Sequence, residues 1–183
     1  AARLALARGR SHHRFSRDAE AVPLLLRATE LAAELGPAGY ETLVVGQVLL
    51  GYILPTVGRL DDARTVLEQV IATCGRAGDR WHLAAAHNNR VMLWTALGQR
   101  DPLIADLDQV RVIGRELGYA RMEWFAHFNL AEALFWLGED AAALDHAEAA
   151  ITLDDRDLGE HARPRSRLLR ARILAWRGDV AAA

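Results

Sequence analysis

Glycine recurs in this sequence at a constant interval. Gly58, Gly98, Gly138 and Gly178 follow one another at steps of 40 residues, and the residues beside them are similar from copy to copy. A long segment in which apolar residues recur every three to four positions precedes each glycine, and a second such segment follows the first three. Equal spacings with similar flanks indicate an internal repeat, so we expect an array of structurally similar units.

Each unit is predicted to consist of two helices. The periodic segments are about 15 to 20 residues long, rich in Ala and Leu and poor in β-branched clusters. Glycine at the boundary permits the left-handed backbone conformation that ends a helix without a Cβ clash. No segment needs to be a strand. The expected helices cover residues 1–14, 18–35, 39–57, 60–75, 80–97, 101–117, 120–137, 140–153 and 162–177.

Two prolines lie inside these expected helices. Pro23 comes one turn into its helix, and Pro55 lies near a carboxyl end. Because proline lacks a backbone N–H and clashes with the preceding turn, we expect a kink or a later helix start at these positions.

The residues around the glycines resemble the tetratricopeptide repeat (TPR) family, in a long form of about 40 residues. The family has a small residue seven positions before the boundary glycine, a large apolar residue four before it, and Ala five after it. The first of these positions holds Gly51, Val91, Ala131 and Ala171; the second Leu54, Trp94, Leu134 and Leu174; the third Ala63, Leu103, Ala143 and Ala183. Apolar residues also occupy positions nine and twelve after the glycine, namely Leu67, Leu107, Ala147, Val70, Val110 and Ala150. The resemblance implies an all-α, right-handed solenoid of antiparallel helix hairpins, with these residues in a continuous core. In the helix over 120–137, the core residues are expected to be Leu130, Ala131, Leu134 and Leu137.

The resemblance covers nearly the whole chain, with departures. The aromatic residue near the start of the first helix is replaced by Gln47, His87, His127 and Arg167, and the proline that usually closes each unit is absent. The implied domain is a single solenoid over 1–183, of about four and a half repeats: 1–38, 39–78, 79–118, 119–160 and a truncated 161–183. Since neither end has a polar capping repeat, we expect a segment of a larger protein whose uncapped ends are capable of self-association.

Composition argues against several classes of function. A net charge of −2 argues against direct nucleic-acid binding. No apolar run approaches the roughly 18 residues needed to cross a membrane. The single cysteine, Cys74, excludes a disulfide framework or a cysteine-built zinc site and fits a reducing, cytoplasmic location. All basic residues are arginine, which together with abundant Ala is typical of a GC-rich bacterial genome.

No catalytic or metal-binding motif is evident. The glycines are too far apart for a phosphate-binding loop, and there is no G-x-S-x-G motif. His82 and His87 lack the i, i+4 spacing of a metal pair, while His87 and His127 occupy equivalent positions and are expected to pack between helices. Carboxylate pairs such as Asp61-Asp62 are explained as helix caps. We therefore expect neither an enzyme nor a bound cofactor or metal.

The first helix of each unit carries a second stripe of residues, offset from the core. The resemblance implies that the first helices line the concave surface of the solenoid. Two, six, ten and thirteen positions before Gly138 this stripe holds Trp136, Glu132, Phe128 and Phe125. An apolar second face must either pack against a neighbour or remain for a ligand, and the sequence leaves both alternatives open. The same positions in the other units include Tyr52, Met92, Arg165, Arg172 and Trp176.

Two asparagines and several arginines add polar groups to this surface. Asn89 and Asn129 lie nine positions before a boundary glycine, where peptide-binding TPR proteins use asparagine to hold the ligand backbone. An amide suits that role because it both donates and accepts; the alternative is a capping or interhelix hydrogen bond. Arginines at both ends, such as Arg10 and Arg165, could clamp an acidic partner or form a solvated rim.

The leading hypothesis is a protein- or peptide-binding TPR scaffold within a larger bacterial signalling or regulatory protein. One alternative is the small-molecule sensor arm of a signalling ATPase or transcription regulator, and another is a self-association or spacer module. The candidate ligand-binding residues are Tyr52, Asn89, Met92, Phe125, Phe128, Asn129, Glu132, Trp136, Arg165, Arg172 and Trp176.

Overall fold

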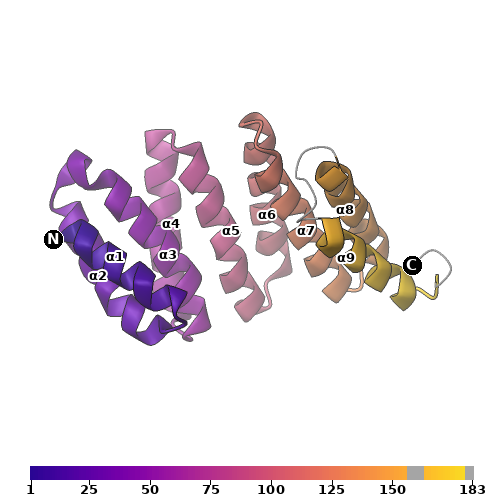
Figure 1. The fold of residues 1–183 in the computed structure, drawn as a ribbon, viewed down its shortest axis with the longest axis horizontal. Coiled ribbons are helices and arrows are strands. Elements are labelled where there is room, and N and C mark those ends of the chain that lie inside the picture. Colours follow the sequence, from indigo (N-terminus) through magenta and orange to yellow (C-terminus); the bar gives the residue numbers. More distant parts are fainter. Residues whose placement is uncertain (156–162, 180–183) are drawn as a thin grey trace. The chain divides into compact units, whose positions relative to one another are not determined.

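The computed structural model describes residues 1–155 and 163–179. Over these residues the chain forms α-helices and one 3₁₀ turn, with no strand, which confirms the all-α prediction (Figure 1). Each predicted helix is present, with its ends within a few residues of those expected. The elements are α1 (Ala2–Arg14), α2 (Asp18–Ala33), the 3₁₀ turn η1 (Gly36–Gly39), α3 (Tyr40–Thr56), α4 (Leu60–Ala77), α5 (Arg80–Leu97), α6 (Arg100–Glu116), α7 (Ala120–Trp136), α8 (Asp140–Leu153) and α9 (Arg163–Trp176).

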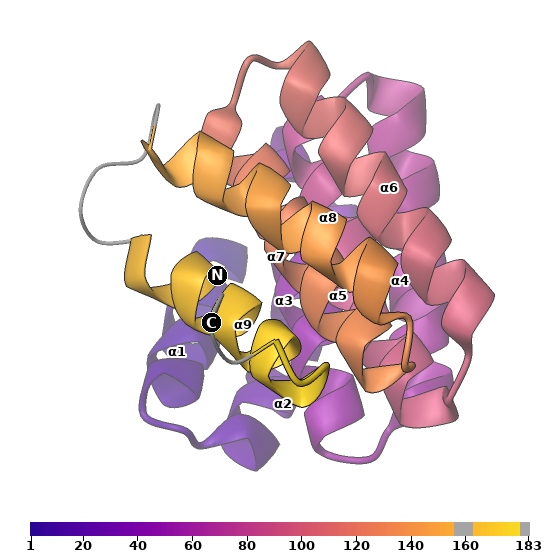
Figure 2. The same cartoon turned by 90° about the vertical axis from the view of Figure 1, so that its right-hand side faces the viewer.

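The chain divides into two compact units, Ala1–Leu103 and Ile104–Ala183, here called unit 1 and unit 2. In unit 1, successive helices from α1 to α5 pack on one another, and α3 also contacts α1 and α5. In unit 2, α8 packs on both α7 and α9, and α7 contacts α9 (Figure 2). We call α1, α3, α5, α7 and α9 the A helices, and α2, α4, α6 and α8 the B helices.

Left-handed glycines end the helices more often than the 40-residue repeat predicts. The four boundary glycines have positive φ, and so do Gly78 and Gly118, which follow the B helices α4 and α6. Gly78 and Gly118 therefore provide the chain reversal between each of these B helices and the next A helix. From α3 to α8, each helix consequently begins 20 residues after the previous one.

Most positions matched to the TPR pattern lie in the core, whereas Val91 and Ala171 are half-buried. Leu54, Leu134 and Leu174 are at most 5% exposed. Gly51 is buried, and a Cβ there would clash with the side chain of Leu67, so the small residue lets α3 approach α4 closely. Also buried are Trp94, Ala63, Leu103, Ala143, Leu67, Leu107, Ala147, Val70, Val110, Ala150, Leu130 and Ala131. Ala183 lies outside the described residues.

Three local expectations are corrected. Leu137 was expected in the core but is 44% exposed, because α7 ends at Trp136 and Leu137 is its C-cap. Pro23 does not delay its helix, since α2 begins at Asp18 and continues through the exposed proline. The helix expected from residue 39 is preceded by the 3₁₀ turn η1.

None of the helices described here is both long enough and apolar enough to cross a membrane.

Candidate binding surfaces

The A helices of unit 1 line an open groove of about 440 Å³. Its apolar lining comes mainly from α3, through Val45, Val48 and Leu49. Tyr52 and Trp81, 38% and 48% exposed, add aromatic surface. Polar groups enter the groove from two of these helices, Arg10 and His13 from α1 and His82 and Asn89 from α5. The arrangement joins apolar contact area to a few polar groups, as small ligand sites and peptide grooves both do.

Carboxylates hold both imidazoles of the groove. His13 Nδ1 lies 2.7 Å from Asp18 Oδ1, and His82 Nδ1 lies 2.8 Å from Asp79 Oδ2. Because Nδ1 is engaged in each ring, Nε2 is the nitrogen available to a ligand. No sequence pattern marks His13, His82 or Trp81 as groove residues, since an Asp–His contact depends on how a turn folds.

Asp79 is the centre of a small network at the start of α5. Its carboxylate accepts the His82 backbone N–H at 3.1 Å and the Tyr40 hydroxyl at 3.0 Å. Burial opposes ionisation of Asp79, but the hydrogen bonds from His82 and Tyr40 outweigh it and lower the pKa of the carboxyl. Burial and the bond to Asp79 raise the pKa of the Tyr40 phenol above its ordinary value. The network therefore fixes the His82 ring beside the groove.

The side-chain amide of Asn89 makes a hydrogen bond within the chain. Its Nδ2 donates to the Val48 carbonyl at 2.8 Å, which ties α5 to α3. The interhelix hydrogen bond considered from the sequence thus exists, and it leaves Oδ1 as the atom for a ligand N–H. Met92 is 38% exposed on the same helix, and Asn129 is half-buried on α7.

In unit 2, helices α7 and α9 bring arginines onto aromatic rings. The Arg165 guanidinium lies 5.1 Å from the Phe128 ring centroid, and that of Arg172 lies 5.0 Å from Phe135 and 5.5 Å from Trp136. Trp176 meets Phe135 edge-on at 6.2 Å. We call this set the aromatic–arginine stripe: Phe128, Phe135, Trp136, Arg165, Arg172 and Trp176.

The stripe combines two exposed tryptophan side chains with a buried phenylalanine. Trp136 and Trp176 are 73% and 74% exposed, whereas Phe128 is buried and stacks on Trp124 at 5.3 Å. Arg172 also reaches Glu132, with a nitrogen–oxygen distance of 3.7 Å. Most of the candidate residues predicted on α7 and α9 therefore lie together.

Phe125 joins this assembly at one end. Its ring meets Trp124 edge-on at 4.8 Å, and the Arg121 guanidinium lies 5.8 Å from it. Phe125 is 38% exposed, so it adds apolar area beside the stripe.

A buried hydrogen bond fixes α9 against α7. Trp124 Nε1 donates to Ser166 Oγ at 2.9 Å, and both residues are less than 4% exposed. This bond sets the register that places Arg165 over Phe128. Neither residue was predicted from the sequence; the available signal was an indole on a core face, which needs a partner for its N–H.

Groups suited to chemistry are sparse in the part of the chain that the structure describes. There, no cluster of three or more His, Cys, Asp or Glu side chains could hold a metal ion. Cys74 is fully buried, and burial raises the pKa of its thiol, so it is not an activated nucleophile.

Solved structures of TPR-like repeat proteins share this fold. A putative kinesin light chain of Podosopora anserina with nearly identical TPR-like repeats has a TM-score of 0.79 and 20% identity, covering 97% of this chain and 87% of that chain. A second crystal structure of that protein has a TM-score of 0.80 and 20% identity, covering 97% of this chain and 86% of that chain. The crystal structure of BtubC (BKLC) from P. vanneervenii has a TM-score of 0.81 and 16% identity, covering 94% of this chain and 71% of that chain.

These likenesses confirm the resemblance to TPR-like repeats at the level of the fold. No family model and no curated protein matches the chain.

Proposed function

We propose that the chain binds a protein or peptide segment on the surface of its A helices, within a larger bacterial signalling or regulatory protein of the cytoplasm. The observation that carries this proposal is the aromatic–arginine stripe. Trp136 and Trp176 are each more than 70% exposed, and Arg172 lies against Trp136. Exposed aromatic side chains cost solubility when they stay in water, so their grouping favours a surface that a partner covers.

The composition of the stripe suits a binding surface. Tryptophan and arginine dominate the residues that contribute most to interface affinity. The arginines are already oriented by the rings beneath them, so less conformational entropy is lost when they bind. Glu132 balances one of the two arginines of the stripe, which leaves a positive balance that favours an acidic segment of the partner.

The groove of unit 1 offers polar groups of its own. Arg10 offers a guanidinium for a carboxylate, and Asn89 Oδ1 can accept a backbone N–H whatever the ligand side chains are. The groove of unit 1 is therefore suited to peptide backbone, and the stripe of unit 2, as a separate surface, to apolar side chains.

Selection from a peptide library against the intact chain tests the proposal. Peptides selected by the intact chain should bind Trp136→Ala at least tenfold more weakly, in line with the roughly 2 kcal/mol of an interface anchor. Phe15→Ala is the matched control, since Phe15 is an aromatic residue 75% exposed on unit 1 and outside both surfaces. Equal weakening by both variants, or no selectable peptide, would overturn the proposal.

The second candidate function is a small-molecule sensor arm. The groove volume of about 440 Å³ falls within the range of small-ligand pockets, about 300 to 1,000 Å³. Thermal stabilisation by metabolites and not by peptides, lost in Tyr52→Ala, would favour it. A self-association module would instead give a dimer in light scattering that Trp136→Ala dissociates.

A further inference from the structure

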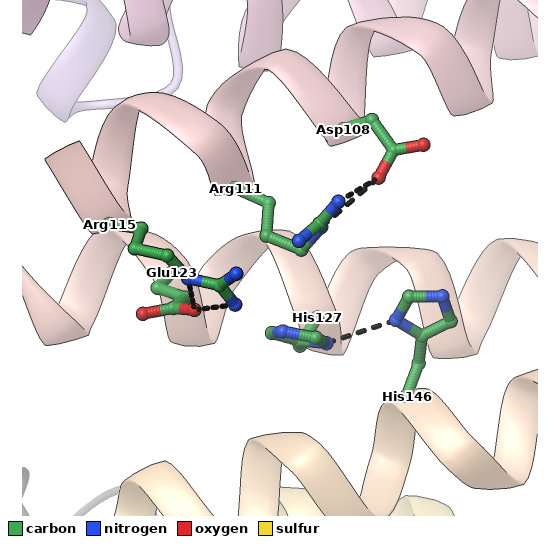
Figure 3. Close-up of polar contacts among 6 residues, drawn as sticks. All are labelled: Asp108, Arg111, Arg115, Glu123, His127 and His146. Carbon is green, nitrogen blue, oxygen red and sulfur yellow. Dashed lines mark hydrogen bonds and ion pairs between the residues drawn. The ribbon is translucent and has the colours of Figure 1, made fainter.

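Two histidines of unit 2 meet ring to ring between α7 and α8. His127 Nδ1 lies 3.0 Å from His146 Nδ1, with ring centroids 5.1 Å apart (Figure 3). Both side chains are half-buried. Neither belongs to the aromatic–arginine stripe, so the proposed function leaves this contact unexplained.

The contact imposes a rule on protonation. Two Nδ1 atoms at 3.0 Å form a hydrogen bond only if one carries a proton and the other offers a lone pair. The bond therefore exists while at least one imidazole is neutral. When both rings are protonated, two N–H groups face each other and the hydrogen bond becomes a repulsion between like charges.

The charged groups around the pair do little to offset that repulsion. Arg111 pairs with Asp108 at 3.1 Å, and Arg115 pairs with Glu123 at 2.7 Å, so both carboxylates are already engaged (Figure 3). The groups that face the two rings are Asp108, Arg111 and Arg115 from α6, Glu123 from α7 and Asp145 from α8. Asp145 is exposed to solvent, which screens its charge.

Burial, the neighbouring His146 and the charge of Arg111 lower the pKa of His127 to about 4. Burial likewise lowers the pKa of His146. In the unfolded chain both imidazoles take up protons near the ordinary value of about 6.5. Between these values the unfolded chain binds more protons than the folded one. The stabilisation of the folded chain by the two neutral imidazoles is therefore present above about pH 6.5 and is lost as the pH falls toward 4.

We propose that the His127–His146 hydrogen bond is an acid-sensitive contact between α7 and α8. It holds α8 on α7 at neutral pH, and α8 is released when the second imidazole is protonated. Because α9 packs on both α8 and α7, release also loosens the support of Arg165 and Arg172. Acidification would then disorder part of the aromatic–arginine stripe while unit 1 keeps its structure. The two histidines lie outside the aromatic–arginine stripe, so the release of α8 does not depend on the proposed function.

Hydrogen exchange of the α8 backbone amides, corrected for intrinsic rates, tests the proposal on the intact chain. Between about pH 7.5 and pH 5, the opening equilibrium of α8 should rise by on the order of tenfold to a hundredfold, a range that allows for solvent screening of half-buried groups. His127→Gln retains a hydrogen-bonding side chain but removes one proton site, so its rise should be clearly smaller than that of the parent chain and reflect His146 alone.

His87→Gln is the matched control, because His87 occupies the same position of the repeat on α5 in unit 1. It should leave the full acid response of α8 in place. A response in His127→Gln as large as in the parent chain, or α8 protection that does not change with pH, would overturn the proposal.

A measurement on the parent chain keeps the test decisive if His127→Gln does not fold. Imidazole titration followed by NMR should show His127 and His146 taking up the second proton well below pH 6.5. Two imidazoles that titrate independently, each with a pKa near 6.5, would contradict a contact that depends on a neutral ring.

Discussion

The two units use equivalent A-helix positions in different ways. In unit 1, α3 presents Val45, Val48 and Tyr52 at the stripe positions, and a groove of about 440 Å³ remains between A helices. In unit 2, α7 presents Phe125, Phe128 and Glu132 at the corresponding positions, and Arg165 of α9 lies over the Phe128 ring. One helical repeat thus produces either a lined groove or an aromatic surface, and the difference lies in the side chains rather than in backbone architecture.

The stability of the two surfaces also rests on different contacts. Unit 1 holds its A helices together partly through the Asn89 bond to the Val48 carbonyl. Unit 2 relies on a buried indole, because Trp124 stacks on Phe128 and donates to Ser166. The stripe should therefore be sensitive to a core substitution that leaves the groove intact.

The largest expected effect comes from Trp124→Ala. Removing a buried indole costs about 3 to 5 kcal/mol through lost burial and the cavity left behind, and it orphans the Ser166 hydroxyl. Hydrogen exchange should show α7, α8 and α9 losing protection while α1 to α4 keep theirs. Ser166→Ala, which removes only the acceptor, should cost about 1 to 3 kcal/mol. Equal loss in both units would mean that they do not respond separately.

Two glycines near the ends of B helices should respond to the same substitution with opposite signs. In α6, a Cβ on Gly114 would lie 2.8 Å from the backbone nitrogen of Glu123, so Gly114→Ala must push α6 away from α7. We expect a loss of about 1 to 3 kcal/mol. In α4, nothing lies within 4 Å of a Cβ on Gly75, so Gly75→Ala should gain about 0.5 to 1 kcal/mol from helix propensity.

Chemical denaturation of the two alanine variants checks this pair. A stabilised Gly114→Ala would contradict the close approach of α6 to α7. A destabilised Gly75→Ala would indicate that this position of unit 1 is more crowded than its surroundings suggest.

Helices and core were predictable because their signals are local. A left-handed glycine ends a helix through its own backbone freedom, and apolar periodicity selects the buried face. The same reasoning failed at Leu137, where the pattern continued one residue past the end of α7. Gly78 and Gly118 carry the same local signal, but they lie outside the 40-residue series of boundary glycines and their role was not predicted.

The side-chain contacts were not predictable in the same way. His127 and His146 are 19 residues apart, and Trp124 and Ser166 are 42 apart. Whether such pairs meet depends on the rotation and register of one helix against another, which no local pattern encodes. Asn89 illustrates the limit: its place on the A-helix surface was foreseen, but not that α3 would take its amide donor.

The smallest effect should come from Arg172→Lys, and it separates geometry from charge. Lysine keeps the positive charge but loses the planar guanidinium that lies 5.0 Å from Phe135 and 5.5 Å from Trp136. We expect a loss of about 0.5 to 1 kcal/mol in denaturation, the size of a cation–π contact at an exposed site. Arg59→Lys is the matched change in unit 1, since Arg59 makes a surface ion pair with Asp62 at 2.6 Å and should lose less than about 0.5 kcal/mol. Equal losses would mean that the rings of unit 2 add nothing beyond charge. A larger loss for Arg172→Lys would mean that stacking on aromatic rings is what distinguishes the arginines of this surface.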